Sequence, residues 1–131
     1  MKVLVTGGMG YIGSHTCIAL HEAGITPVIY DNLSNASPRV LDQLEKITGT
    51  RFEFILGDIQ DEQQFKLALK QTHAEAVFHF AALKAVGEST EQPLRYYQNN
   101  VSGTLSMLQN MQDEGVNHII FSSSATVYGE P

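Results

Sequence analysis

The chain has 131 residues, of which 43% are hydrophobic and 17% are charged, a composition typical of a globular domain and not of a disordered segment. Its formal net charge of −6 argues against nucleic acid as the main partner, because a phosphate backbone is bound by clustered Lys and Arg residues. The single cysteine excludes an internal disulfide. With no signal-peptide pattern and no apolar run near the ~18 residues that span a bilayer, we expect a cytoplasmic protein without a membrane partner.

Short apolar runs that end in turn residues alternate along the chain with segments of helical periodicity. Strands are predicted at 2–6, 27–30, 51–56, 76–80 and 118–121. Helices are predicted from about residue 12 to the stop at Gly24, over about 39–46, from the capping box of Asp61 and Gln64, and from Pro93 to Gly115. The expected apolar face of the first helix is Ile12, Thr16, Ala19 or Leu20, and Ala23; that of the last is Leu94, Tyr97, Val101, Leu105, Leu108 and Met111.

This alternation predicts the α/β class. The expected architecture is a doubly wound, Rossmann-type parallel sheet of about five strands, with helices on both faces and right-handed crossovers. No repeat, low-complexity segment or linker interrupts the pattern, so residues 1–131 are interpreted as one domain.

A glycine-rich turn follows the first predicted strand and opens the first predicted helix. It reads Gly7-Gly8-Met9-Gly10-Tyr11-Ile12-Gly13. Backbone N–H groups at a helix N-terminus bind a pyrophosphate, a side chain on the middle glycine would block its approach, and the last glycine lets helix and strand pack closely. The turn therefore predicts a dinucleotide site; the competing interpretation is a tight turn without a ligand.

Two acidic residues follow predicted strands at the same edge of the sheet. Asp31 ends the second strand, where a carboxylate accepts both hydroxyls of an adenosine ribose. This predicts NAD over NADP, whose 2′-phosphate the carboxylate would repel; the alternative is a cap or turn residue. Asp58 lies in Gly57-Asp58-Ile59 and is a weaker candidate for the adenine amino group, since Asp after Gly is common in turns.

These residues, together with His79-Phe80-Ala81-Ala82 and Ser122-Ser-Ser-Ala-Thr-Val-Tyr128, resemble the extended short-chain dehydrogenase/reductase family. The stretch from Phe80 to Ser89, with Tyr96 to Val101, is more specific and is similar to the nucleotide-sugar 4-epimerases of that family. The resemblance covers essentially the whole chain.

The resemblance implies NAD as the cofactor and a UDP-galactose or UDP-glucose substrate that is inverted at C4 through a 4-keto intermediate. The implied cofactor contacts are Gly7, Gly10, Tyr11, Ile12, Gly13, Asp31, Asn32, Asn35, Asp58, Ile59, Phe80, Ala81, Ala82, Lys84, Asn99 and Ser122. Lys84 and Ser124 would contact the substrate, with Ser124 as the catalytic serine at O4. Helical geometry alone favours Asn100 over Asn99. No metal site is expected, since the histidines are scattered.

Three features depart from the family pattern. Met9 is bulkier than usual and is expected to crowd the glycine turn, and Ala36 replaces a hydroxyl near the adenosine. The family's Tyr-x-x-x-Lys pair does not occur in the chain, because Tyr128 belongs to the serine motif. We therefore interpret the sequence as an incomplete NAD-binding part, without the last strands and the substrate domain. It is expected to be inactive alone and a homodimer when intact. The alternatives are a nucleotide-sugar dehydratase or decarboxylase, or a non-catalytic dinucleotide-binding module.

Overall fold

The computed structural model describes residues 1–33, 36–80 and 103–121. Within these ranges one sheet contains β1 (Lys2–Thr6), β2 (Thr26–Asp31), β3 (Glu53–Leu56), β4 (Ala76–His79) and β5 (His118–Phe121). Neighbouring strands are parallel and lie in the order β3-β2-β1-β4-β5. The helices are α1 (Tyr11–Glu22), α2 (Arg39–Thr48), α3 (Glu62–Thr72) and α6 (Gly103–Asp113). The predicted doubly wound parallel sheet is confirmed.

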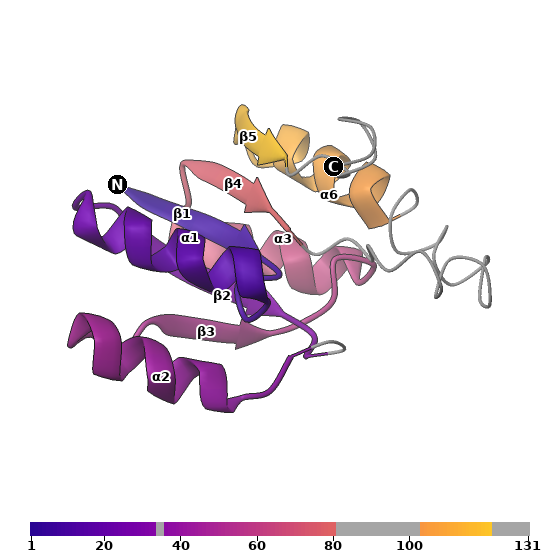
Figure 1. The fold of residues 1–131 in the computed structure, drawn as a ribbon. Helices are drawn as coiled ribbons and strands as arrows, with labels where there is room; N and C mark the ends of the chain where they lie inside the picture. Colours follow the sequence, from indigo (N-terminus) through magenta and orange to yellow (C-terminus); the bar gives the residue numbers. More distant parts are fainter. Residues whose placement is uncertain (34–35, 81–102, 122–131) are drawn as a thin grey trace, which may run out of the picture.

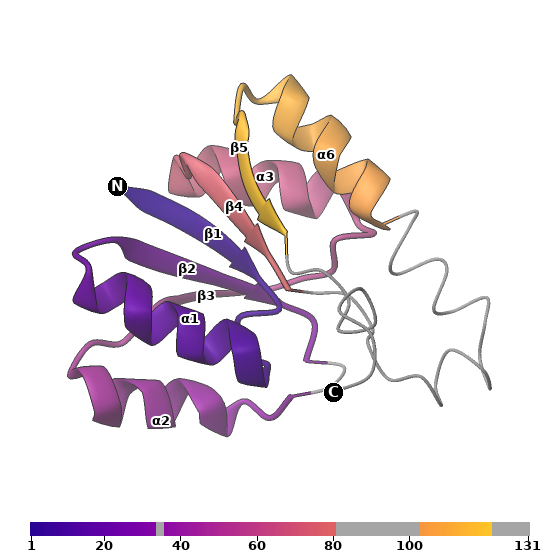
Figure 2. The same cartoon turned by 45° about the horizontal axis from the view of Figure 1, so that its top comes forward.

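The sheet separates two helical layers. α1 and α2 cover one face, and α3 and α6 cover the other (Figures 1 and 2). Because successive strand residues point to opposite faces, Leu4 and Tyr30 enter the core under α3 and α6, whereas Val5 and Ile29 enter the core under α1 and α2. Burial on both faces accounts for apolar runs in the strands that do not alternate with polar residues.

The carboxyl ends of the strands meet at one edge, where hydrogen bonds tie the following loops together. In the register, Thr6 of β1 lies between Tyr30 of β2 and His79 of β4. The Gly7 N–H donates to the Tyr30 carbonyl at 2.9 Å, and the Phe80 N–H donates to the Thr6 carbonyl at 2.8 Å. The strand order reverses between β1 and β4, and an open α/β sheet binds ligands at such a point.

The structure corrects the predicted face of α1. Its buried residues are Gly13, Cys17 and Leu20, whereas Ile12 is 49% exposed. The stripe is displaced because Gly13, which has no side chain, is the residue at which the helix approaches the turn after β1 most closely.

The predicted face of α6 is also partly wrong. Met107 and Met111 are buried, but Leu105 and Leu108 are 62% and 41% exposed. The helix packs on α3 through a stripe that includes the polar Asn110, whose amide donates to the Glu62 carbonyl at 3.0 Å. An apolar pattern could not identify that stripe. Residues 94, 97 and 101 of the predicted face lie outside the described residues.

Only half of the predicted capping box forms at the start of α3. The Asp61 carboxylate accepts from the Gln64 N–H at 3.1 Å, as expected of an N-cap. The Gln64 side chain, however, donates to the Leu56 carbonyl at 2.8 Å, and the Asp61 N–H donates to the Asp58 carbonyl. The helix is therefore tied to the end of β3. None of the described helices has the length and apolar character that crossing a bilayer would need.

Candidate functional site

The glycine turn brings α1 against the end of β1 at backbone distance. Gly7 has a φ of 71°, in the left-handed region that favours glycine. A Cβ added to Gly13 would lie 2.2 Å from the Gly7 carbonyl oxygen, and one added to Gly8 would lie 2.9 Å from Cγ2 of Ile29. These three glycines are thus required by the folded chain itself, with or without a ligand.

Gly10 differs from the other glycines of the turn because it faces open space. A Cβ there would meet only the Gly7 carbonyl oxygen, at 3.4 Å. The first hydrogen bond of α1 runs from the Ser14 N–H to the Gly10 carbonyl, so the N–H groups of Tyr11 and Ile12 lack an intrahelical acceptor. A cavity of about 180 Å³ opens here, lined by Gly7, Gly10, Tyr11, Ile12, Gly13 and Phe80. The arrangement can bind an anion at the positive end of the helix dipole.

Met9 does not crowd this cavity, contrary to the sequence-based expectation. Its side chain is 1% exposed and packs in the core between the sheet and the layer of α1 and α2. Its backbone N–H donates to Oδ2 of Asp31 at 3.0 Å. The bulk of the methionine is accommodated because the chain turns that side chain inward, away from the glycine cavity.

Asp31 is only 8% exposed at the end of β2. Oδ2 accepts the Met9 N–H, and Oδ1 accepts the Leu33 N–H at 2.7 Å. None of the ion pairs between described side chains involves Asp31. Each carboxylate oxygen keeps lone-pair capacity beyond its one backbone donor, so the group can still accept hydroxyl donors from a ligand.

Asp58 and Asn32 lie side by side after β3 and β2. The Asn32 Nδ2 donates to Oδ2 of Asp58 at 3.1 Å, and the Gln60 N–H donates to Oδ1 at 2.9 Å. Ile59, by contrast, is 3% exposed and packs in the core beneath α3 and α6. Ile59 can therefore offer a ligand its backbone but not its side chain.

Tyr30 contacts the turn that carries Asp58 from the core side of that turn. The sequence did not identify it as a site residue. Its hydroxyl donates to the Asp58 carbonyl at 2.8 Å. A tyrosine within an apolar strand is expected to be a core residue, and Tyr30 is indeed only 1% exposed. The available signal was the strand alternation, which places Tyr30 on the opposite face from Asp31.

His79 is a buried, hydrogen-bonded histidine at the end of β4. It is 1% exposed, with Nδ1 2.6 Å from the Thr6 hydroxyl and Nε2 3.2 Å from the Thr104 hydroxyl. The imidazole thereby links β1, β4 and the start of α6. Phe80 follows it and lines the glycine cavity.

The remaining predicted site residues lie outside the described part of the chain. They are Asn35, Ala81, Ala82, Lys84, Asn99, Ser122 and Ser124. Among the residues that are described, no cluster of three or more His, Cys, Asp or Glu side chains could hold a metal ion.

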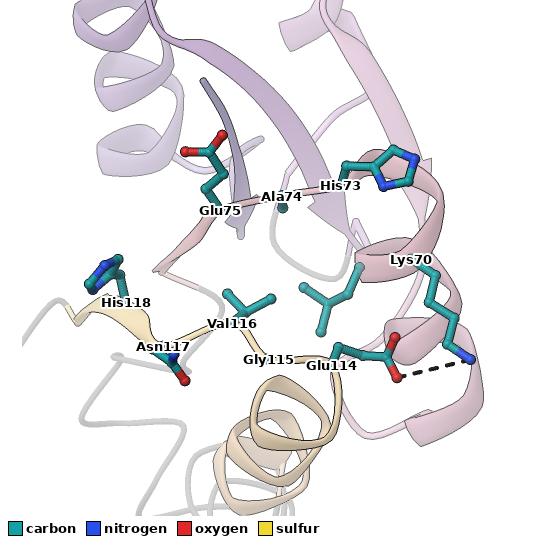
Figure 3. A pocket seen from close by; sticks show the side chains of 10 residues that line it. Lys70, His73, Ala74, Glu75, Glu114, Gly115, Val116, Asn117 and His118 are labelled. Atoms are coloured by element: carbon teal, nitrogen blue, oxygen red, sulfur yellow. Dashed lines mark ion pairs between the residues drawn. The ribbon is translucent and has the colours of Figure 1, made fainter.

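A larger cavity, of about 680 Å³, lies at the opposite edge of the sheet, where β4 and β5 begin (Figure 3). Its lining includes the apolar Leu69 and Val116 and also Lys70 and Glu114, which form an ion pair at 3.9 Å. Open α/β sheets bind their ligands at the carboxyl ends of the strands, whereas this cavity lies at the amino ends of β4 and β5. We therefore assign the candidate site to the smaller cavity at the carboxyl edge.

A parallel sheet in this order, with a glycine turn after β1 and an acidic residue ending β2, defines a Rossmann-type domain. The comparisons with known proteins agree with this class. The family model described as GDP-mannose 4,6 dehydratase matches residues 4–131. The UDP-glucose 4-epimerase of Klebsiella pneumoniae is 55% identical over 130 residues, which are 99% of this chain and 94% of that protein. The chain therefore belongs to the nucleotide-sugar enzyme family of that model, and within it to the UDP-glucose 4-epimerase family.

Two solved structures share the fold over the whole chain. The UDP-glucose 4-epimerase of Stenotrophomonas maltophila, with bound NAD and formylated UDP-arabinopyranose, matches with a TM-score of 0.95 and 48% identity. That of Bifidobacterium longum, in complex with NAD⁺ and UDP, matches with a TM-score of 0.94 and 46% identity. The chain covers 39% of each of these two proteins. It spans 38% of the curated relative from Erwinia amylovora, to which it is 54% identical.

Proposed function

We propose that the chain is the NAD-binding part of a UDP-glucose 4-epimerase. The observation that carries the proposal is the joining of the glycine turn to the acid of β2, through the Met9 N–H and the Asp31 carboxylate. The pyrophosphate and the adenosine ribose are neighbours in NAD. This hydrogen bond fixes the spacing between the glycine turn, which suits the pyrophosphate, and the Asp31 carboxylate, which suits the ribose. The relatives solved with bound NAD support the choice of cofactor.

The pyrophosphate would bind at the start of α1. The cavity beside Gly10 is lined by Tyr11 and Ile12, whose N–H groups have no intrahelical acceptor. A Cβ on Gly10 would take the space of the phosphate. The first turn of α1 contains no acidic residue to repel an anion. The shape and the field of this cavity therefore both fit the phosphate groups of the cofactor.

The adenosine would bind beyond the end of β2. The Asp31 carboxylate would accept the two ribose hydroxyls, which favours NAD over NADP because a 2′-phosphate would be repelled. Asn32, Asn35, Asp58 and the backbone of Ile59 would surround the base. The exposed Asn32 side chain donates a hydrogen bond to the partly buried Asp58 carboxylate, so the two groups lie together at this end of the sheet.

When bound, NAD supplies a hydride acceptor and donor for C4 of a UDP-hexose. In this chain, Phe80, Ala81, Ala82, Lys84, Asn99 and Ser122 would line the cofactor. Ser124 would hydrogen-bond the O4 hydroxyl and orient the sugar for proton transfer, with Lys84 also at the substrate. We also propose that the intact protein is a homodimer. The exposed Leu105 and Leu108 of α6 supply apolar surface that a second copy could cover.

Calorimetric titration of the chain with NAD and with NADP tests the cofactor assignment. We expect weak NAD binding and weaker NADP binding. Equal affinity for the two, or no binding of either by a chain with native circular dichroism, would refute the proposed site.

The epimerase assignment needs an activity test. The chain alone is proposed not to interconvert UDP-galactose and UDP-glucose, because no Tyr-x-x-x-Lys pair is present in its residues. A hybrid in which the chain replaces the matching 38% of the Erwinia amylovora relative should be active in a coupled assay. Turnover by the chain alone, lost in Ser124→Ala, would contradict the first expectation.

A second candidate follows from the family model, whose description names a dehydratase. A nucleotide-sugar dehydratase would release a 4-keto-6-deoxy sugar, whereas an epimerase returns a 4-hydroxy sugar. Product analysis of the hybrid separates the two. A hybrid that binds NAD but forms neither product would favour a non-catalytic dinucleotide-binding module.

A further inference from the structure

The hydroxyl of Tyr30 reaches from the core to the turn that carries Asp58. The Tyr30 ring packs edge-to-face on Phe65, with the ring centroids 5.3 Å apart. Its hydroxyl donates to the Asp58 carbonyl at 2.8 Å, and the same carbonyl accepts the Asp61 N–H at 3.0 Å. The turn is thus held by a core side chain on one side and by the start of α3 on the other.

The Tyr30 ring also excludes any side chain at position 57. A Cβ on Gly57 would lie 2.6 Å from both Cζ and the hydroxyl oxygen of Tyr30. The Gly57 N–H in turn donates to the Asp31 carbonyl at 3.1 Å. Ring contact, hydroxyl and backbone together determine where the turn lies relative to β2.

The backbone of Tyr30 holds the other loop of the proposed site. Its carbonyl accepts the Gly7 N–H at 2.9 Å, at the first residue of the glycine turn. One buried residue therefore contacts both the turn proposed for the pyrophosphate and the turn proposed for the adenine. Burial raises the pKa of the Tyr30 hydroxyl well above its ordinary value, and the Asp61 and Asp58 carboxylates raise it further, so the group remains a neutral donor.

We propose that Tyr30 is a positioning residue for recognition of the adenine base. Its hydroxyl holds the turn so that the Asp58 carboxylate stands beside Asn32, where the carboxylate accepts a hydrogen bond from the exocyclic amino group. This role rests on the proposed NAD site, and Tyr30 itself does not touch the ligand.

The test compares NAD with nicotinamide hypoxanthine dinucleotide, in which a carbonyl replaces that amino group. Tyr30→Phe keeps the ring and removes one hydrogen bond. We expect its Kd for NAD to rise roughly two- to tenfold, the range for one hydrogen bond, with a smaller change for the hypoxanthine analogue. The ratio of the two Kd values, and with it the preference for NAD over the hypoxanthine analogue, should therefore become smaller. Thr72→Val is the matched control: it removes another buried hydroxyl, which donates to the Ala68 carbonyl at the other end of α3, and should leave both Kd values unchanged.

Amide hydrogen exchange of the ligand-free chain supplies a readout that does not depend on binding. In Tyr30→Phe the amides of Gln60 and Asp61 should exchange faster, while that of Ser14 in α1 should not change. An unchanged preference between the two dinucleotides, or equal weakening of both, would overturn the positioning role alone. A wild-type chain that binds neither dinucleotide would overturn the proposed NAD site and this role with it.

Discussion

The backbone N–H of Met9 and Oδ2 of Asp31 are joined by a 3.0 Å hydrogen bond that connects the middle of the glycine turn to the end of β2. Their positions in the sequence are 22 residues apart, and α1 lies between them. Because the Met9 side chain is anchored in the core, the donor is held in place before any ligand binds. Preorganisation of this kind lowers the entropic cost of binding.

Asp31→Ala should weaken NAD binding and narrow the preference for NAD over NADP. It should also lower the free energy of unfolding by about 1–3 kcal/mol, because the N–H groups of Met9 and Leu33 lose their acceptor. Titration calorimetry and urea unfolding measure the two effects. Asp31→Asn is the control, since it keeps one oxygen acceptor while removing the charge. An unchanged cofactor preference in both variants would remove Asp31 from the site.

Substitution of two glycines of the turn should affect different properties, ligand binding for Gly10 and stability for Gly13. Gly10→Val should abolish dinucleotide binding and preserve the melting temperature, because Gly10 has an extended φ of −75° and its Cβ would meet little besides the ligand space. Gly13→Ala should lower the melting temperature, because its Cβ would overlap the Gly7 carbonyl. Fluorescence titration and thermal unfolding separate the effects. Normal binding by Gly10→Val would place the phosphate site elsewhere.

Gly57→Ala should destabilise the fold by about 1–3 kcal/mol, the usual cost of overpacking a filled core. The reason is the 2.6 Å approach of its Cβ to the Tyr30 ring. In a Tyr30→Leu background the same substitution should cost less, because the smaller side chain vacates that space. A double-mutant cycle by urea unfolding measures the coupling; additive costs would show that the two residues do not compete for the same volume.

Cys17 should make stability fall with rising pH above about 9. Burial raises the pKa of its thiol from the ordinary 9.0 to about 12. Between these values the unfolded chain releases a proton that the folded chain retains, so the unfolded state binds fewer protons and the free energy of unfolding falls as pH rises. Urea unfolding at pH 8 and pH 10 should show this slope in the wild type and a smaller one in Cys17→Ala. Equal slopes would mean that other groups cause it.

Ser124→Ala, tested in the hybrid with the Erwinia amylovora relative, should lower turnover roughly 10²-fold or more with little change in the Kd for NAD. The hydroxyl is proposed to orient O4 and not to hold the cofactor. Ser122→Ala in the same hybrid is a matched loss of a nearby hydroxyl and should affect cofactor affinity more. Wild-type rates in Ser124→Ala would end its assignment as the catalytic serine.

Much of the architecture followed from the sequence because its signals are local. Strands buried on both faces read as continuous apolar runs, and helices end where glycine adopts a positive φ, as at Gly24 and Gly115. The glycine turn, with Asp31 at the end of the second strand, indicated the candidate site for the same reason. The positions of Asn35, Lys84, Asn99, Ser122 and Ser124 remain predictions.

Side-chain partners could not be obtained in this way, because they depend on which elements meet in space. The sequence indicated a crowded turn at Met9, but the packing of α1 and α2 receives that side chain in the core. It also indicated a capping box at Gln64. In the structure the Gln64 side-chain amide donates instead to the Leu56 carbonyl, because the end of β3 lies close to the start of α3.

The sequence by itself determined the order and type of the described elements, the glycine turn after the first strand and the acid of the second strand, since each is encoded by residues close together in the chain. Only the tertiary structure decided that Tyr30 reaches Asp58, that Asn32 and Asp58 share a hydrogen bond, and that Leu105 is exposed while Asn110 is buried. The physical reason is that parallel strands are paired through long crossovers. Contacts at the carboxyl edge therefore join residues that periodicity and local spacing cannot relate.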